Sequence, residues 1–251
     1  MSCARAGLVT AFLIASLPQV SSSQDLGSWP QHSKERPKPP IVTPGKSNLP
    51  LPPPADAIVL FDGKDLSKWT SANGAPAKWK VVEGAFEVVA GTGTLSTRDA
   101  FGDVQLHVEW MAPNPPKGED QDRGNSGVFL MGIYELQVLD SYGNVTYADG
   151  QAGALYGQYP PLVNASRPPG EWQSYDIVFH RPRFDAAGKV LSPARFTVVH
   201  NGVLVQDNAA LVGPTAHTTR PPYTAHADAL PITLQDHGHP VRYRNIWLRK
   251  L

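Results

Sequence analysis

The sequence has almost no cysteine and no surplus of charge. Its 251 residues include one cysteine, Cys3, and 22 basic residues balance 22 acidic ones. A protein that binds nucleic acid needs an excess of positive charge, commonly with interleaved aromatic residues, and the chain has no such patch. We therefore expect no nucleic-acid partner, and no disulfides that staple the domain or carry redox chemistry.

Several catalytic motifs are also missing. The chain contains no Gly-x-Ser-x-Gly elbow for a serine nucleophile, no phosphate-binding loop and no dinucleotide fingerprint. Long helical patterns are scarce, whereas glycine (22) and proline (25) are abundant. This composition favours an all-β domain with many turns.

The N-terminus is typical of a secretory signal peptide. Arg5 precedes an apolar run over residues 7–17, and small residues follow at 20–23. The run is too short to span a membrane, although a buried N-terminal helix is the alternative. We predict a signal peptide at residues 1–24, a secreted or periplasmic protein, and no transmembrane segment once the signal is removed. Cys3 would leave with the signal.

Residues 25–55 are predicted to be a proline-rich linker. Residues 30–54 hold nine prolines, with lysine, serine and glutamine between them. Such chains are extended and bury little, so a spacer is favoured over a ligand for a proline-recognition domain.

Residues 56–251 are predicted to form the folded domain. Short apolar or alternating stretches recur there, separated by turn signals such as Asn201-Gly202, whose residues tolerate the positive φ of a tight hairpin. His107 and Glu109 lie on the polar side of one alternating stretch, where a solvated face is favoured. About ten to twelve strands are expected, which suits a two-sheet β-sandwich.

One predicted strand carries the most informative polar residues. Glu135 and Gln137 alternate with Leu136 and Val138, so the two polar side chains should share the face opposite the core. Asp140 is five residues from Glu135, an odd spacing that puts the two on opposite faces of a regular strand. They share a site only if the strand bulges or ends before Asp140; otherwise Glu135 is solvated and Asp140 caps a turn.

Two further polar clusters could join this strand. One includes Arg123 and Asn125, in a glycine-rich turn directly before another strand. The second is formed by Gln235, Asp236 and His237 after an apolar strand. Histidine can act as an acid, a base or a metal ligand near neutral pH, but the spacing matches no standard zinc motif. Each cluster alone is also compatible with an ordinary surface loop.

Taken together, the motifs resemble those of the 3-keto-disaccharide hydrolase family, which has a concanavalin A-like lectin/glucanase fold. The matching segments follow one another in order at residues 60–69, 101–110, 124–130, 134–140, 153–157, 170–172, 201–203, 234–238 and 244–248. Residues 113–122 and 209–229 look longer than the family needs. The resemblance implies a jelly-roll β-sandwich whose concave sheet binds a sugar.

The resemblance also implies an enzyme that cleaves 3-keto-disaccharides or other 3-keto-glycosides by elimination and hydration. The implied catalytic residues are Glu135, His237 and Asp140. The implied substrate-binding residues are Arg123, Asn125, Gln137, Gln235 and Asp236. A divalent metal ion could share the site. An ordinary glycoside hydrolase and a non-catalytic carbohydrate-binding module are the alternatives.

Overall fold

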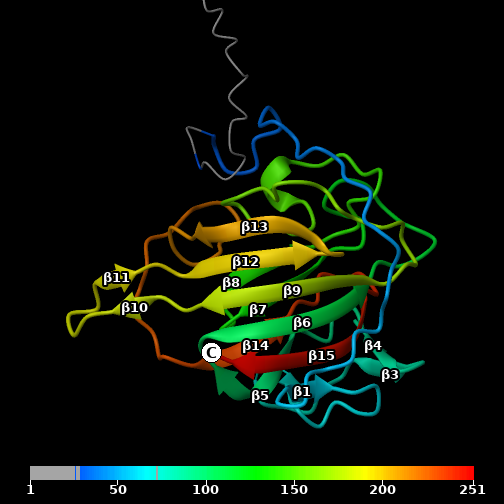
Figure 1. Cartoon of the computed structure of the whole chain (residues 1–251), viewed down its shortest axis with the longest axis horizontal. Coiled ribbons are helices and arrows are strands. Elements are labelled where there is room, and N and C mark those ends of the chain that lie inside the picture. Colours follow the sequence, from blue (N-terminus) through cyan, green and yellow to red (C-terminus); the bar gives the residue numbers. More distant parts are fainter. Residues whose placement is uncertain (1–25, 27–28, 72) are drawn as a thin grey trace, which may run out of the picture.

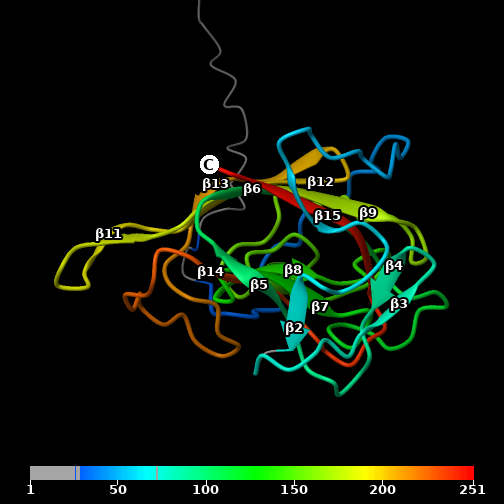
Figure 2. The same cartoon turned by 90° about the horizontal axis from the view of Figure 1, so that it is seen from below.

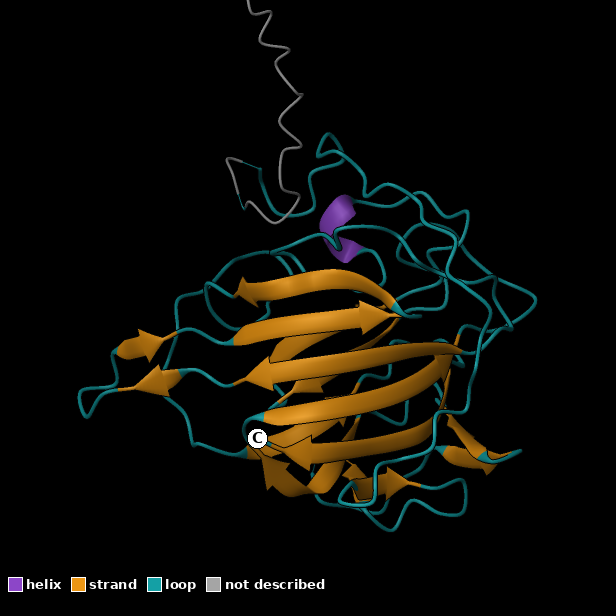
Figure 3. Cartoon of the chain, in the orientation of Figure 1, coloured by secondary structure: helices purple, strands orange, loops and turns teal. Residues whose placement is uncertain are grey.

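The protein is described by a computed structural model that covers residues 26, 29–71 and 73–251. Within these residues the chain forms fifteen strands and one short 3₁₀ helix, η1 (Ala148–Gly150), so the all-β prediction is confirmed (Figures 1 and 3). In this part of the chain no helix has the length and apolar character needed to cross a membrane. The predicted signal peptide lies outside the described residues, and export stays a prediction.

The strands form two main antiparallel sheets and one small hairpin. The eight-stranded sheet contains, in spatial order, β13 (Val203–Ala210), β12 (Arg195–His200), β9 (Gln173–His180), β6 (Val104–Met111), β15 (Arg242–Lys250), β4 (Ala85–Glu87) and β3 (Lys80–Val82), with β1 (Ile58–Phe61) also paired to β15. The five-stranded sheet contains β2 (Trp69–Ser71), β5 (Leu95–Phe101), β14 (Leu230–Leu234), β7 (Ser126–Leu130) and β8 (Tyr134–Val138). The hairpin pairs β10 (Arg183–Phe184) with β11 (Val190–Ser192).

The two main sheets lie face to face and enclose the core, as the predicted β-sandwich requires (Figure 2). In β6 the alternating residues Val104, Leu106, Val108 and Trp110 are all buried. In β8, Leu136 and Val138 belong to the same core. The period-2 pattern therefore assigns the inner face of each sheet correctly.

The outer face of β6 departs from expectation. His107 and Glu109 were expected on a solvated face, but they are only 1% and 0% exposed. The backbone N–H of Leu51 donates to Glu109 Oε1 at 2.9 Å, so the proline-rich segment covers this face. The alternation of polar and apolar residues within β6 cannot predict that a segment far away in the sequence covers its outer face.

The proline-rich segment is extended, but from residue 29 onward it contacts the sandwich instead of standing apart from it. Val42 N–H donates to Asn164 O at 2.9 Å, beside a bridge between Ile41 and Asn164. Arg36 is 4% exposed and donates to Gln158 O at 3.1 Å. Pieces of the segment thus complete the surface of the domain.

The hairpin predicted at Asn201-Gly202 is confirmed. These two residues join β12 to β13 and have φ values of 51° and 82°, in the left-handed region that Asn and Gly tolerate.

Candidate active site

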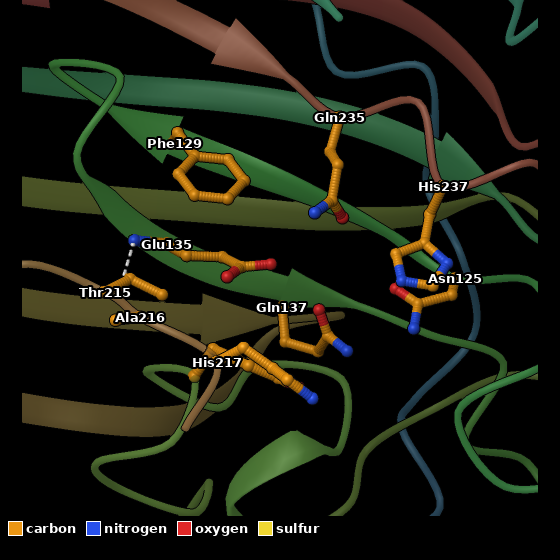
Figure 4. A pocket seen from close by; sticks show the side chains of 10 residues that line it. Asn125, Phe129, Glu135, Gln137, Thr215, Ala216, His217, Gln235 and His237 are labelled. Atoms are coloured by element: carbon orange, nitrogen blue, oxygen red, sulfur yellow. Dashed lines mark hydrogen bonds between the residues drawn. The ribbon is translucent and has the colours of Figure 1, made fainter. Parts of the chain in front are cut away.

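A pocket of about 260 Å³ lies on the outer side of the five-stranded sheet, over β7, β8 and the end of β14 (Figure 4). Its volume is slightly below the roughly 300 Å³ at which typical ligand cavities start. The residues that line it are Asn125, Phe129, Glu135, Gln137, Tyr156, Thr215, Ala216, His217, Gln235 and His237.

Strand register gathers the floor of the pocket. Phe129 lies opposite Glu135 across the β7–β8 pair, and Gly127 lies opposite Gln137. On the other side of β7, the N–H of Gln235 donates to Gly127 O at 3.0 Å. Outward-facing side chains of neighbouring strands therefore stand side by side, as the alternation in β8 predicts.

Two loops cover the free edge of β8 and build the walls. Gln137 N–H donates to Ala154 O at 2.9 Å, and Tyr156 N–H donates to Glu135 O at 3.3 Å. From the second loop, the Thr215 hydroxyl accepts from Glu135 N–H at 3.0 Å (Figure 4). The loops satisfy the edge hydrogen bonds of β8, so its outward side chains are enclosed as well.

The Glu135 carboxyl group is buried without a compensating charge. The residue is 4% exposed, and burial raises the pKa of Glu135 to about 8. Its carboxyl oxygens have no hydrogen bond or ion pair within the described part of the chain. Gly127 makes room for the group, because a Cβ at that position would lie 2.5 Å from Glu135 Oε1. Such a desolvated, unpaired acid in a pocket is typical of a catalytic group.

Amide side chains surround this acid. Gln137 donates through Nε2 to Gln121 Oε1 at 3.0 Å and to Gly150 O at 3.3 Å, which fixes its orientation. Gln137 Oε1 and Gln235 Oε1 are buried and have no hydrogen-bond partner among the described residues. Buried acceptors without partners are costly, so a polar ligand with donor groups would be stabilised here.

Two histidines stand at the rim, where the pocket meets solvent. His237 and His217 are both exposed, in contrast to the buried floor. The His237 ring stacks on His239 with centroids 5.9 Å apart, and His239 Nε2 lies 3.1 Å from Asp122 Oδ1. Figure 4 shows the Glu135 carboxyl group reaching into the space between Gln137, Gln235 and His237. An acid and an imidazole thus share one cavity.

The structure brings five of the eight predicted site residues to the pocket, namely Glu135, His237, Asn125, Gln137 and Gln235. Arg123, Asp140 and Asp236 do not line it. Arg123 Nε donates to Asp140 Oδ2 at 2.8 Å, and Asp140 Oδ1 accepts from Tyr142 N–H at 3.2 Å. Asp236 accepts from Gly93 N–H and Gly238 N–H, both at 2.9 Å.

Asp140 lies past the end of β8, which was one of the two arrangements that would let it join Glu135. Its side chain turns to Arg123 instead. Burial raises the pKa of Asp140, and the charge and hydrogen bond of Arg123 oppose that rise. In this arrangement Arg123 and Asp140 hold the loops beside the pocket.

Sequence reasoning missed Tyr156 and His217 as lining residues. Tyr156 Oη lies 2.8 Å from Tyr147 Oη and 3.1 Å from His217 Nδ1. Burial raises the pKa of the Tyr156 hydroxyl, although its hydrogen bond to Tyr147 opposes this. Both residues come from irregular loops without periodicity; the available signals were the family-matching segment 153–157 for Tyr156 and the unusual length of residues 209–229 for His217.

No group of three or more histidine, cysteine, aspartate or glutamate side chains in residues 26, 29–71 and 73–251 is arranged to hold a metal ion. Glu135 and the two rim histidines share the pocket but do not form such a group.

Comparison with known proteins assigns the domain. Residues 56–249 match the family described as the 3-keto-alpha-glucoside-1,2-lyase-like domain. The chain belongs to this family. The match spans both sheets and every residue of the pocket, and the family resemblance drawn from the motifs is confirmed.

A curated relative and solved structures agree with this assignment. The chain is 27% identical over 172 residues to a 3-keto-disaccharide hydrolase of Bacteroides thetaiotaomicron, covering 53% of this chain and 56% of that protein. The chain thus matches only about half the length of that relative. A crystal structure of a candidate glycosyl hydrolase from Parabacteroides distasonis is 47% identical, with a TM-score of 0.79, covering 86% of this chain and 93% of that one. A second from the same organism, 20% identical with a TM-score of 0.56, covers 78% of this chain and 99% of that one and shares the fold.

Proposed function

We propose that this protein cleaves the glycosidic bond of 3-keto-glycosides, 3-keto-disaccharides in particular, by elimination followed by hydration in the Glu135 pocket. The family assignment and the Bacteroides relative support the substrate class. The observation that carries the chemistry is the buried Glu135 carboxyl group, which has no partner and a pKa raised to about 8.

The reaction begins at the carbon next to the ketone. The carbonyl acidifies the proton on carbon 2, and a base removes it to give an enolate. The electron pair then forms the carbon 1–carbon 2 double bond as the bond from carbon 1 to the aglycone oxygen breaks. The departing oxygen takes up a proton, and water then adds across the double bond. The net change is hydrolysis.

Protonation states suggest how the roles divide. With a pKa of about 8, Glu135 is mainly the neutral acid at pH 7, so it can donate a proton to the departing oxygen. His237 is the base that we assign to the proton on carbon 2, because it lines the same pocket at its solvent side. Once Glu135 has given up its proton, its carboxylate can activate the incoming water.

The uncharged floor suits the substrate. Asn125, Gln137 and Gln235 present amides, and the two unpartnered Oε1 atoms can accept hydrogen bonds from sugar hydroxyls. Ordinary glycoside hydrolysis uses a pair of carboxyl groups about 5 to 9.5 Å apart. Of the ten residues that line this pocket, Glu135 is the one with a carboxyl group. Elimination, which needs one acid and one base, therefore fits better.

The test compares a 3-keto-disaccharide with the same disaccharide before oxidation. We expect turnover of the keto form and little of the plain form. Glu135→Gln and His237→Ala should each lower kcat by roughly 10²- to 10⁴-fold. Asp236→Asn is the matched control, because Asp236 lies next to His237 but outside the pocket. Wild-type rates in both pocket variants would refute the roles, and binding without turnover would indicate a carbohydrate-binding module.

A further inference from the structure

Residues 29–36, which we call the N-terminal strap, lie behind one wall of the pocket. They precede the family domain at residues 56–249 and belong to the segment predicted to be a spacer. In the structure the strap reaches η1 and the loop that contains Thr215 and His217 (Figures 1 and 3).

Two strap side chains hold the backbone of that loop. Gln31 Nε2 donates to Ala216 O at 2.6 Å, and His32 Nε2 lies 2.5 Å from His217 O. Ala216 and His217 both line the pocket. The strap thus fixes two consecutive carbonyl groups of the wall.

The His32 ring also packs against the aromatic side of the wall. Its centroid lies 4.3 Å from that of Tyr147, 5.0 Å from Tyr156 and 5.3 Å from His217. Tyr156 and His217 line the pocket, and they are joined to each other and to Tyr147 through the Tyr156 hydroxyl. His32 is therefore one contact removed from the cavity.

The backbone of His32 is unusual as well. Its φ is 61°, in the left-handed region that non-glycine residues seldom adopt. The N–H of His32 donates to Asp149 Oδ2 at 3.1 Å, and Asp149 is fully buried. Although burial opposes it, the backbone hydrogen bond from His32 and the nearby His32 ring, whose Nδ1 lies 3.7 Å from Asp149 Oδ1, lower the pKa of Asp149. A residue with a strained backbone that is held by a buried carboxylate indicates that its position is constrained and that the segment does more than connect two parts of the chain.

Arg220 closes the arrangement on the far side. Its Nη1 donates to Trp29 O at 3.1 Å, and its Nε donates to Gly157 O at 2.7 Å, next to Tyr156. The same guanidinium lies 3.8 Å from Asp149. Arg220 thus connects the strap, η1 and the two loops that form the walls of the pocket.

We propose that the strap is part of the active site, with Gln31 and His32 as positioning residues that hold the Tyr156–His217 wall against the substrate. The kinetic consequence rests on the function proposed above, whereas the structural one does not. Small displacements of positioned groups can cost on the order of 10²-fold in rate.

The first experiment measures the wall directly. His32→Asn keeps a residue that tolerates positive φ but is too short to reach His217, so it removes the ring contacts and spares the backbone. Hydrogen exchange of the Thr215 and Tyr156 amides, which bond to Ile133 O and Glu135 O, should quicken at least about tenfold in His32→Asn and Gln31→Ala. Glu35→Ala is the control, because Glu35 is exposed in the same strap.

The second experiment measures turnover of a 3-keto-disaccharide. We expect kcat/KM to fall at least about tenfold in His32→Asn, mainly through kcat, with a melting temperature within a few degrees of wild type. Unchanged exchange, or faster exchange with unchanged kcat, would overturn the proposal. If the wild-type protein turns over no 3-keto-glycoside, the proposed function fails, and the exchange result alone decides whether the strap holds the wall.

Discussion

Two buried glutamates, Glu109 and Glu135, lie on the outer faces of opposite sheets and behave in opposite ways. Glu109 in β6 is 0% exposed, and Glu135 in β8 is 4% exposed. Glu109 accepts from Arg244 Nε at 2.7 Å, Asn245 Nδ2 at 2.7 Å and Leu51 N–H at 2.9 Å. Glu135 has no such donors to its carboxyl group.

The pKa shifts follow from this difference. Burial opposes ionisation of both groups, but the hydrogen bonds to Glu109 from His107, Asn245 and Arg244 outweigh it and lower its pKa. At Glu135 burial acts alone and raises the pKa to about 8. Burial by itself therefore does not make a carboxyl group a candidate for catalysis; burial without donors, beside an open cavity, does.

The largest expected effect is on stability at Glu109. Glu109→Gln leaves the Arg244 guanidinium, 23% exposed in its side chain, without its buried counter-charge. Removing one partner of a buried pair costs roughly 3–5 kcal/mol, so the free energy of unfolding should fall by about that amount. Urea unfolding at pH 7 measures it, with Glu83→Gln at the exposed ion pair with Arg242 as the control. Equal unfolding midpoints in the two variants would show that the buried contacts of Glu109 do not stabilise the fold.

A substitution of Glu135 is expected to have the opposite effect on stability. The unfolded carboxyl group has a pKa near 4.5 and the folded one near 8, so between these values the unfolded state loses a proton that the folded state keeps. Stability therefore declines as pH rises from about 4.5, and the full penalty is present above about 8. Glu135→Gln removes it and should stabilise the protein by up to about 5 kcal/mol at pH 9 but not at pH 4. Unfolding at the two pH values tests this, and an equal difference at both would contradict it.

The contrast between these residues also shows how far the sequence could predict the site. Alternation in Glu135-Leu136-Gln137-Val138 assigned the faces of β8 correctly, because side-chain direction follows from the strand itself. The burial of Glu109 was unpredictable, since its cover comes from Leu51, far along the chain. In the sequence Arg123 and Asp140 each resembled a site residue. In the structure they form an ion pair with each other, which the sixteen residues between them conceal at the level of sequence. Tyr156 and His217 reach the pocket through the conformations of irregular loops, and no periodic sequence pattern predicts such conformations.

A smaller effect concerns the pH dependence of turnover. If neutral Glu135 donates the proton, kcat/KM should fall about tenfold per pH unit above about 8, as the acid form is lost. The residual activity of Glu135→Gln should lack this decline, whereas Glu109→Gln should keep it. Initial rates between pH 6 and 10 provide the measurement. A rise through pH 8 would instead make Glu135 the base.

The smallest expected effect probes the space around the Glu135 carboxyl group. Gly127→Ala places a Cβ 2.5 Å from Glu135 Oε1 and 2.9 Å from Phe129 Cε2, so both side chains must move while the backbone need not. We expect kcat/KM to fall about tenfold, with stability changed by less than about 1 kcal/mol, as the carboxyl group leaves its reactive position. Gly45→Ala is the matched control, since nothing lies within 4 Å of a Cβ there. Because Gly127→Ala keeps the acid and displaces only side chains next to residue 127, an unaffected rate would show that the position of the Glu135 carboxyl group does not matter for turnover.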